Sequence, residues 1–162
     1  MATPVQPTGR LSTPLHQLKA LLAASPAWQA WCGDAATAAA SIYLVTMPSK
    51  SGTPHILIDF DAELQRTRDA IDGGRFAQNG GLQLYFCDQA RNKDTDDACT
   101  DLANRADAVL ADLEEAPTMG GYGLVLTGYG IKAGPTRMTE EVRPKYGDLV
   151  ELLFSLSYVV PS

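Results

Sequence analysis

The two carboxylates at Asp59 and Asp61 are the residues of this chain that most directly suggest chemistry. They close an apolar run, residues 55–60 (H-I-L-I-D-F), which reads as a strand, so residues two apart would point to the same side. Magnesium-dependent nucleases use such pairs but also need a further acidic group, for which Glu63 is the nearest candidate, and usually a lysine. We favour the simpler interpretation, that the strand leaves the core for solvent here.

The histidines and cysteines do not form a recognisable metal site or nucleophile. His16 falls in a predicted helix and His55 in a predicted strand, and neither has a cysteine or carboxylate at ligand spacing. Cys32, Cys87 and Cys99 are odd in number and include no C-x-x-C pair, which is typical of reduced structural thiols in a cytosolic protein. No G-x-S-x-G turn is present either.

The acidic cluster near residue 94 superficially suggests a calcium loop. An EF-hand starting at Asp94 would need glycine and glutamate where Cys99 and Arg105 stand. Acidic residues at the positive end of a helix explain the cluster better. The glycines of 120–123 and 128–130 flank a strand and do not open a helix, so they do not match a phosphate-binding loop. We therefore expect no catalytic residue, no metal and no cofactor, and predict that the chain is not an enzyme.

Composition places the chain among ordinary globular proteins. It has 162 residues, of which 45% are hydrophobic and 20% charged, and this length is enough for a core without disulfides or metals. The formal net charge of −6 argues against a general nucleic-acid-binding surface. No apolar run is long enough to span a bilayer, and the first residues lack the apolar core of a signal peptide.

The end of the chain, residues 147–160, carries the clearest structural pattern. Every even position from Val150 to Val160 is apolar, while the odd positions are mixed, which predicts a half-buried antiparallel strand. Such a strand would be roughly 36 Å long, about twice the usual length. We infer a sheet that reaches beyond its own core towards a neighbour.

The remaining patterns predict an α+β fold in one domain. Residues 1–12 read as a flexible N-terminal arm and residues 13–162 as a single domain. Helices are expected after Thr13-Pro14, at residues 27–32 after Ser25-Pro26, and at residues 94–115; strands are expected at 41–45, 55–60, 82–86, 123–134 and near the C-terminus. Residues 61–80 are ambiguous, with loop signals at 72–74 and 79–81. The expected architecture is a mainly antiparallel sheet of four to five strands with helices on one face and a long C-terminal β-hairpin.

Two charged segments and the odd face of the last strand are the candidate contact surfaces. The polar loop 135–146 reads either as a solvated hairpin tip or as a contact arm, since arginine, tyrosine and methionine are enriched at protein interfaces. A weaker case exists for residues 63–76. The candidate interface residues are Arg66, Arg68, Arg75, Arg137, Met138, Glu140, Glu141, Arg143, Lys145, Tyr146, Leu149, Leu153 and Val159.

Taken in order, these segments resemble a known family. The series runs S-P-A-W, I-Y-L-V-T-M-P, P-H-I-L-I-D-F, L-Q-L-Y-F-C-D, the helix D-D-A-C-T-D-L-A-N-R-A-D-A-V-L, and a hairpin ending G-D-L-V-E-L-L-F-S-L-S-Y. It is similar to the tail-terminator (tail-completion, or minor tail) proteins of long-tailed bacteriophages. The resemblance spans roughly residues 12–160 and rests on element order and apolar pattern. The long charged segment 61–80 and the proline-containing arm 1–12 depart from the usual pattern.

The resemblance implies a structural virion protein of the tail or neck, present in the host cytoplasm during assembly. Such proteins form a homo-oligomeric ring, with six subunits expected, that caps the head-proximal end of the tail tube and stops its growth. The implied partners are further copies of the chain, the tail tube protein and the head–tail connector or stopper; DNA only passes through the channel, and no membrane is involved. The family needs no cofactor and has no catalytic site.

Three alternatives stay open at this point. One is a head-completion (stopper) protein of the neck, or a tail-tube subunit. Another is the small magnesium-dependent nuclease built on Asp59, Asp61 and Glu63. The third is a monomeric binding module that uses the long last strand to pair with an extended peptide.

Overall fold

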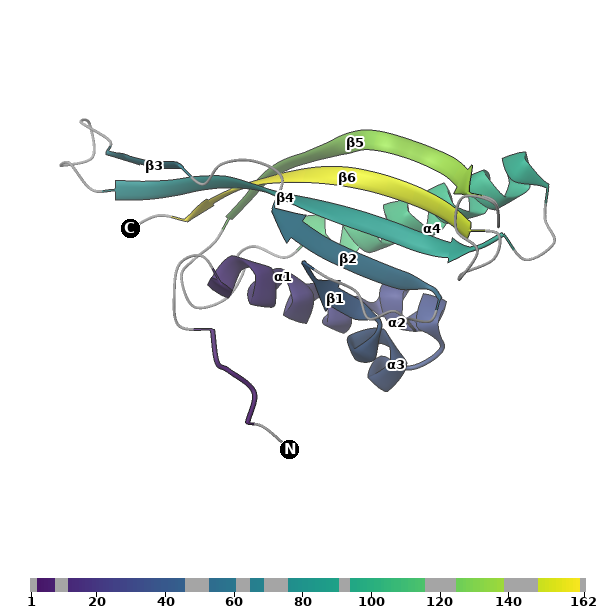
Figure 1. Ribbon diagram of the computed structural model, residues 1–162, viewed down its shortest axis with the longest axis horizontal. Helices are drawn as coiled ribbons and strands as arrows, with labels where there is room; N and C mark the ends of the chain where they lie inside the picture. Colours follow the sequence, from purple (N-terminus) through teal and green to yellow (C-terminus); the bar gives the residue numbers. More distant parts are fainter. Residues whose placement is uncertain are drawn as a thin grey trace.

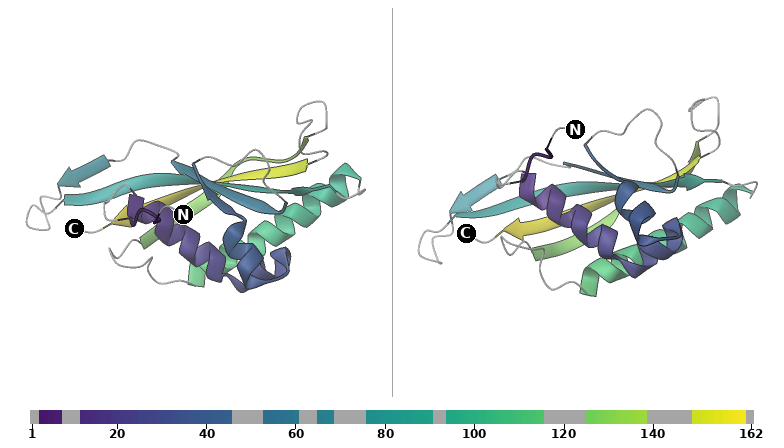
Figure 2. Two further views of the ribbon diagram at one scale, coloured as in Figure 1. Left: turned by 60° about the horizontal axis from the view of Figure 1, so that its bottom comes forward. Right: turned by 90° about the horizontal axis from the view of Figure 1, so that it is seen from below.

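Helices cover one face of a single mixed sheet, and the opposite face carries no helix in the part of the chain that the structure describes (Figures 1 and 2). The computed structural model describes residues 3–7, 12–45, 53–60, 65–68, 76–90, 94–115, 125–138 and 149–160. Within these ranges it has four helices and six strands. The predicted α+β class is confirmed.

The helices begin where the sequence supplies capping side chains. Helix α1 spans Ser12–Ala24, and α2 spans Pro26–Cys32 behind the N-cap Ser25, whose hydroxyl accepts from the backbone N–H of Trp28. The long helix α4, Thr95–Glu115, starts behind Asp94, whose carboxylate accepts from the N–H of Asp97 at 2.8 Å. These three helices match the predictions, except that α1 begins at Ser12, so Thr13 and Pro14 lie inside the helix and do not precede it. A further short helix, α3 (Ala35–Ala40), was not predicted.

The sheet has the order β1-β2-β4-β6-β5. Its strands are β1 (Ile42–Leu44), β2 (His55–Phe60), β4 (Phe76–Gln89), β6 (Leu149–Val160) and β5 (Val125–Met138). Strand β1 pairs with β2 in parallel, and the other neighbours are antiparallel. A sixth strand, β3 (Gln65–Arg68), pairs with the first part of β4. The C-terminal strands thus form the expected long hairpin, although its connecting residues 139–148 lie outside the described ranges.

Strand β4 is much longer than the predicted strand at 82–86. It includes Gly80 and Gly81, which the sequence suggested were part of a loop, and that prediction was wrong. The two glycines pair with Tyr158 and Ser157 of β6. Glycine weakens an isolated strand, but backbone hydrogen bonding to a long partner holds these residues extended. The ambiguous segment also contains β3, so part of it is sheet.

Strand β5 runs past the predicted end at residue 134. Pro135 to Met138 remain in the strand, and Thr136 to Met138 pair with β6, whereas their polar composition predicted a loop. The register shifts at three points along this pair, which places bulges in β5. Proline and bulges are tolerated here because β5 is the last strand in the order of the sheet. Its outer side makes no hydrogen bonds to a further described strand.

The core lies between the helices and the covered face of the sheet. The even positions of β6 from Val150 to Tyr158 are all buried, as the alternation predicted. They meet residues of α4 spaced three and four apart, in particular Leu102, Ala106, Val109 and Leu113. Cys99 of the same helix is only partly buried, whereas the adjacent Ala98 is buried.

Candidate assembly surfaces

Most of the residues predicted from sequence to form contacts have no described side chain. Arg75, Glu140, Glu141, Arg143, Lys145 and Tyr146 lie outside the described residues, and so does the loop 139–146 itself. The strands hold the backbones of Arg66 and Arg68 in β3, Arg137 and Met138 in β5, and Val159 in β6. The structure therefore distributes these residues over the sheet and does not bring them together at one described site.

Leu149 and Leu153, on the odd face of β6, have different environments. Leu149 is only 1% exposed, so it belongs to the interior and does not offer a free contact surface, contrary to the prediction. It stands at the end of β6 that pairs with Gln89, beside other well-buried residues such as Cys87. Leu153 is half-buried in the middle of the strand and remains accessible.

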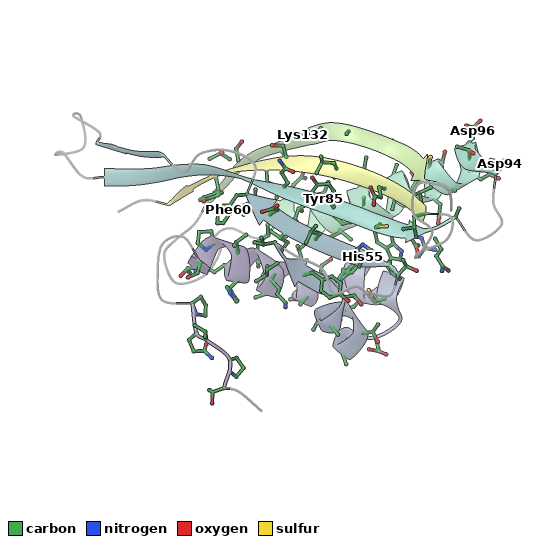
Figure 3. All side chains as sticks on the ribbon, in the orientation of Figure 1. His55, Phe60, Tyr85, Asp94, Asp96 and Lys132 are labelled. Carbon is green, nitrogen blue, oxygen red and sulfur yellow. The ribbon has the colours of Figure 1, made fainter. Side chains whose placement is uncertain are left out.

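The sheet has an open face around Leu153. Its neighbours there are Tyr85 of β4, directly opposite in register, and the half-buried Gln83 and Ser155. The Tyr85 hydroxyl donates to Gln83 Oε1 at 3.0 Å, and Figure 3 shows Tyr85 on the side of the sheet turned to the viewer. No described helix or strand packs over this patch. Mixed apolar and polar side chains of this kind occur on ordinary protein surfaces and at interfaces alike.

One end of the sheet extends beyond the helices. Strand β3 and the first residues of β4 form a two-stranded extension in which β3 pairs with residues 76–79. Strand β6 joins β4 from residue 78 on, and its Tyr158 already lies in the core. Figure 1 shows this extension at the left, past the start of α1. No described helix covers either of its faces. The sheet therefore reaches past the helices, but β3 and β4 carry it there, because the last strand stays in the core as far as Tyr158.

An apolar groove lies at the outer edge of the sheet, between α4 and β5. It has a volume of about 450 Å³. The lining residues are Ala103, Asn104 and Asp107 of α4, Tyr129, Gly130, Ile131 and Pro135 of β5, and Leu152 and Phe154 of β6. Ile131 is 65% exposed and Tyr129 36%, so the outer wall of the groove is apolar and accessible.

Tyr129 is held in place from two sides. Its ring meets Phe154 edge-on, with centroids 6.2 Å apart, and its hydroxyl donates a short hydrogen bond to Glu114 of α4. The hydrogen bond to the carboxylate, with a smaller effect of desolvation, raises the pKa of Tyr129 to about 12. The tyrosine therefore ties the outer strand to α4 and keeps one wall of the groove fixed.

The groove was not predicted from the sequence. Tyr129 and Ile131 share one face of their strand, which was a usable signal of an apolar surface. Whether that surface is buried depends on how far α4 reaches over the outer strand, and this is a property of helix packing that no local pattern contains.

The buried polar groups have structural roles. Asp88, 5% exposed, accepts from the indole N–H of Trp31 at 3.0 Å and so ties α2 to the sheet. The Arg105 guanidinium lies 5.8 Å from the Trp31 ring centroid and pairs with Asp101 at 3.2 Å. Burial, Asp88 and Asp34 together raise the pKa of the Cys32 thiol to about 11, which keeps it protonated and unreactive.

The residues considered for catalysis or metal binding do not converge in the described part of the chain. Asp59 accepts from the N–H of Phe60 at 2.7 Å, while Asp61 and Glu63 lie outside the described residues. Figure 3 shows Asp94 and Asp96 at the start of α4, well separated from His55 on β2. Among the described residues, no three His, Cys, Asp or Glu side chains gather closely enough to bind a metal ion.

Comparisons with known proteins identify no relative. No protein-family model matches the chain, and no curated protein shows significant similarity to it. In the described ranges, the helices are too short or too polar to cross a membrane.

Proposed function

We propose that this protein is a structural subunit of a bacteriophage tail, the tail terminator, which forms a ring on the head-proximal end of the tail tube. In this role the ring stops polymerisation of the tube and gives the head–tail connector a surface on which to dock. The terminator assignment rests on the sequence resemblance, and the proposal of an assembly subunit rests on the shape of the sheet.

The observation that carries the proposal is the extension of β3 and the first residues of β4 beyond the helices. A strand edge that protrudes from the core can pair with other chains and cause aggregation, and contacts between copies in a closed ring remove this liability. The open face around Tyr85 and Leu153 adds a second surface suited to association. Together these two surfaces favour a subunit of a larger assembly over a protein that acts as a monomer.

A monomeric module that captures an extended peptide by strand addition has less support. Of the outer strands, β1 has only three residues and β3 only four. In the longer outer strand, β5, three register shifts and Pro135 interrupt the backbone groups that a new strand would pair with. No arrangement of the described residues favours the nuclease. The carboxylate of Asp59 accepts a hydrogen bond from the backbone N–H of Phe60.

Native mass spectrometry tests the assembly. We expect a ring, with six subunits the expected number, or a shift towards one as concentration rises or as tail tubes are added. Leu153→Asp on the open face should weaken the assembly, while Ala111→Asp on an exposed position of α4 should leave it unchanged. A strict monomer under all conditions, tail tubes included, would overturn the proposal.

Electron microscopy of particles made without this chain separates the terminator from a neck role. Tails of uncontrolled length are the expected result. Tails of normal length that fail to join heads would instead assign the chain to the neck and overturn the terminator assignment.

A further inference from the structure

The groove between α4 and β5 has the size and lining of a peptide-binding site. Its volume of about 450 Å³ falls within the about 300–1,000 Å³ of typical binding pockets. The side chains of Leu152 and Phe154 connect it to the core, and the accessible Tyr129 and Ile131 form its outer wall. A groove with an aromatic wall suits a short extended segment that presents apolar side chains.

The chain itself contains a segment of this kind. Residues 3–7, Thr-Pro-Val-Gln-Pro, run extended and largely exposed, and Val5 is 91% exposed (Figure 1). Pro4 and Pro7 are three positions apart, which is one turn of a polyproline helix, so in that conformation both rings lie on the same side. Grooves with aromatic walls bind such segments favourably because little conformational entropy is lost.

The charges of the two surfaces are complementary. Helix α4 carries seven acidic residues, Asp96, Asp97, Asp101, Asp107, Asp112, Glu114 and Glu115, against the single basic residue Arg105. Of these, Asp107 lines the groove and Glu114 holds Tyr129. Residues 1–11 include Arg10 and no acidic residue. Attraction between them would favour binding and would weaken as salt is added.

The arm and the groove lie at opposite edges of the sheet. The arm leads into α1, which packs against β1 and β2, whereas the groove lies beside β5 at the other end of the strand order. Val5 lies seven residues before the start of α1, and seven extended residues span at most about 25 Å, so Val5 can reach a molecule that abuts this edge of the sheet. A contact between opposite edges of identical subunits is head-to-tail, the type that closes into a ring.

We propose that the groove of one subunit binds residues 3–7 of the neighbouring subunit, with Val5 placed against Ile131 and Tyr129. This inference rests on the proposed ring and identifies one contact that would hold it together. The arm of each copy would then be ordered by its neighbour.

Disulfide trapping tests the contact in the full-length chain. Val5→Cys and Ile131→Cys are prepared separately, one of them labelled with ¹⁵N, then mixed, concentrated and mildly oxidised. We expect a disulfide between the two engineered positions, joining a labelled to an unlabelled chain. Val5→Cys mixed with Val45→Cys is the matched control, because Val45 is also an exposed valine but lies at β1, away from the groove.

The assembly itself provides a second readout. Val5→Asp and Ile131→Glu should each raise the concentration for half-assembly by about tenfold, since each removes a buried apolar contact. Val45→Asp should change it by less than about twofold, the effect expected for an exposed site without a partner.

The outcomes separate this inference from the proposed function. If rings form but no disulfide joins positions 5 and 131, the arm contact is contradicted and the proposed ring is not. A bond that forms inside single chains, in the double variant at a concentration where only monomer is present, would overturn the role of the neighbour. Absence of any ring, even with tail tubes, would overturn both.

Discussion

At the scale of single residues, Asp112 of α4 links this helix to α2. Its Oδ2 accepts from the Ser25 hydroxyl at 2.5 Å and from the N–H of Ala27 at 3.1 Å, so α4 supplies part of the cap of α2. We expect Asp112→Ala to lower the free energy of unfolding by about 1–2 kcal/mol, because it leaves these part-buried donors unsatisfied. Urea unfolding measures this. Glu115→Ala, on the exposed end of α4, is the control, and an equal effect of the two variants would contradict the interpretation.

Cys32 should react more slowly than its partial exposure alone would suggest. With its pKa raised to about 11, little thiolate is present at pH 8, so alkylation by iodoacetamide should be about tenfold or more slower than for a free cysteine. Asp34→Asn should speed the reaction because it removes one of the charges that raise the pKa. Peptide mass mapping identifies the modified cysteine. A rate unaffected by pH between 8 and 10 would contradict the prediction.

Tyr129 should lose its proton at a higher pH than an ordinary tyrosine does. Its folded pKa of about 12 lies above the usual value, so the hydrogen bond to Glu114 stabilises the fold fully below about pH 10. This contribution is lost as pH rises from about 10 towards about 12. Absorbance at the tyrosinate band measures the titration, with Tyr129→Phe as the reference. Glu114→Gln should move the pKa towards its ordinary value; an unchanged pKa in that variant would refute the Glu114 carboxylate as the cause of the shift.

At the scale of elements, the two faces of β6 should respond differently to truncation. Leu156 is fully buried under the helices, and Leu156→Ala should lower the free energy of unfolding by about 2–5 kcal/mol. Leu153 faces the open side, so Leu153→Ala should lower it by less than about 1.5 kcal/mol and act mainly on assembly. Thermal or urea unfolding of the dispersed protein compares them. Equal losses would mean that the odd face is as well packed as the even one.

The buried face of β6 could be predicted because its apolar residues occupy every second position of the strand. Residues 55–60 were likewise identified at both ends. The failures came where neighbours decide the conformation. Gly80 and Gly81 are extended because β6 pairs with them, and Pro135 is accepted because β5 is an outer strand. Leu149 is buried although it shares the mixed face, because burial changes along the length of a strand.

At the scale of the whole molecule, net charge bears on the proposed channel. The chain carries a formal charge of −6, and an acidic subunit lining a channel would repel DNA, which then slides through without sticking. We expect no retention of double-stranded DNA by the assembled protein in a gel-shift assay, even at low salt. Strong retention that falls with added salt would indicate a basic inner wall and contradict this prediction.

The sequence by itself determined the α+β class, the three capped helices and the buried face of the last strand, because local propensity and periodicity record which side of an element meets the core. Tertiary structure alone decided the rest. The extension of β3 and β4 beyond the helices and the groove beside Tyr129 and Ile131 depend on where α1 and α4 end relative to the strands. That placement results from packing between residues far apart in the chain, which no local pattern specifies.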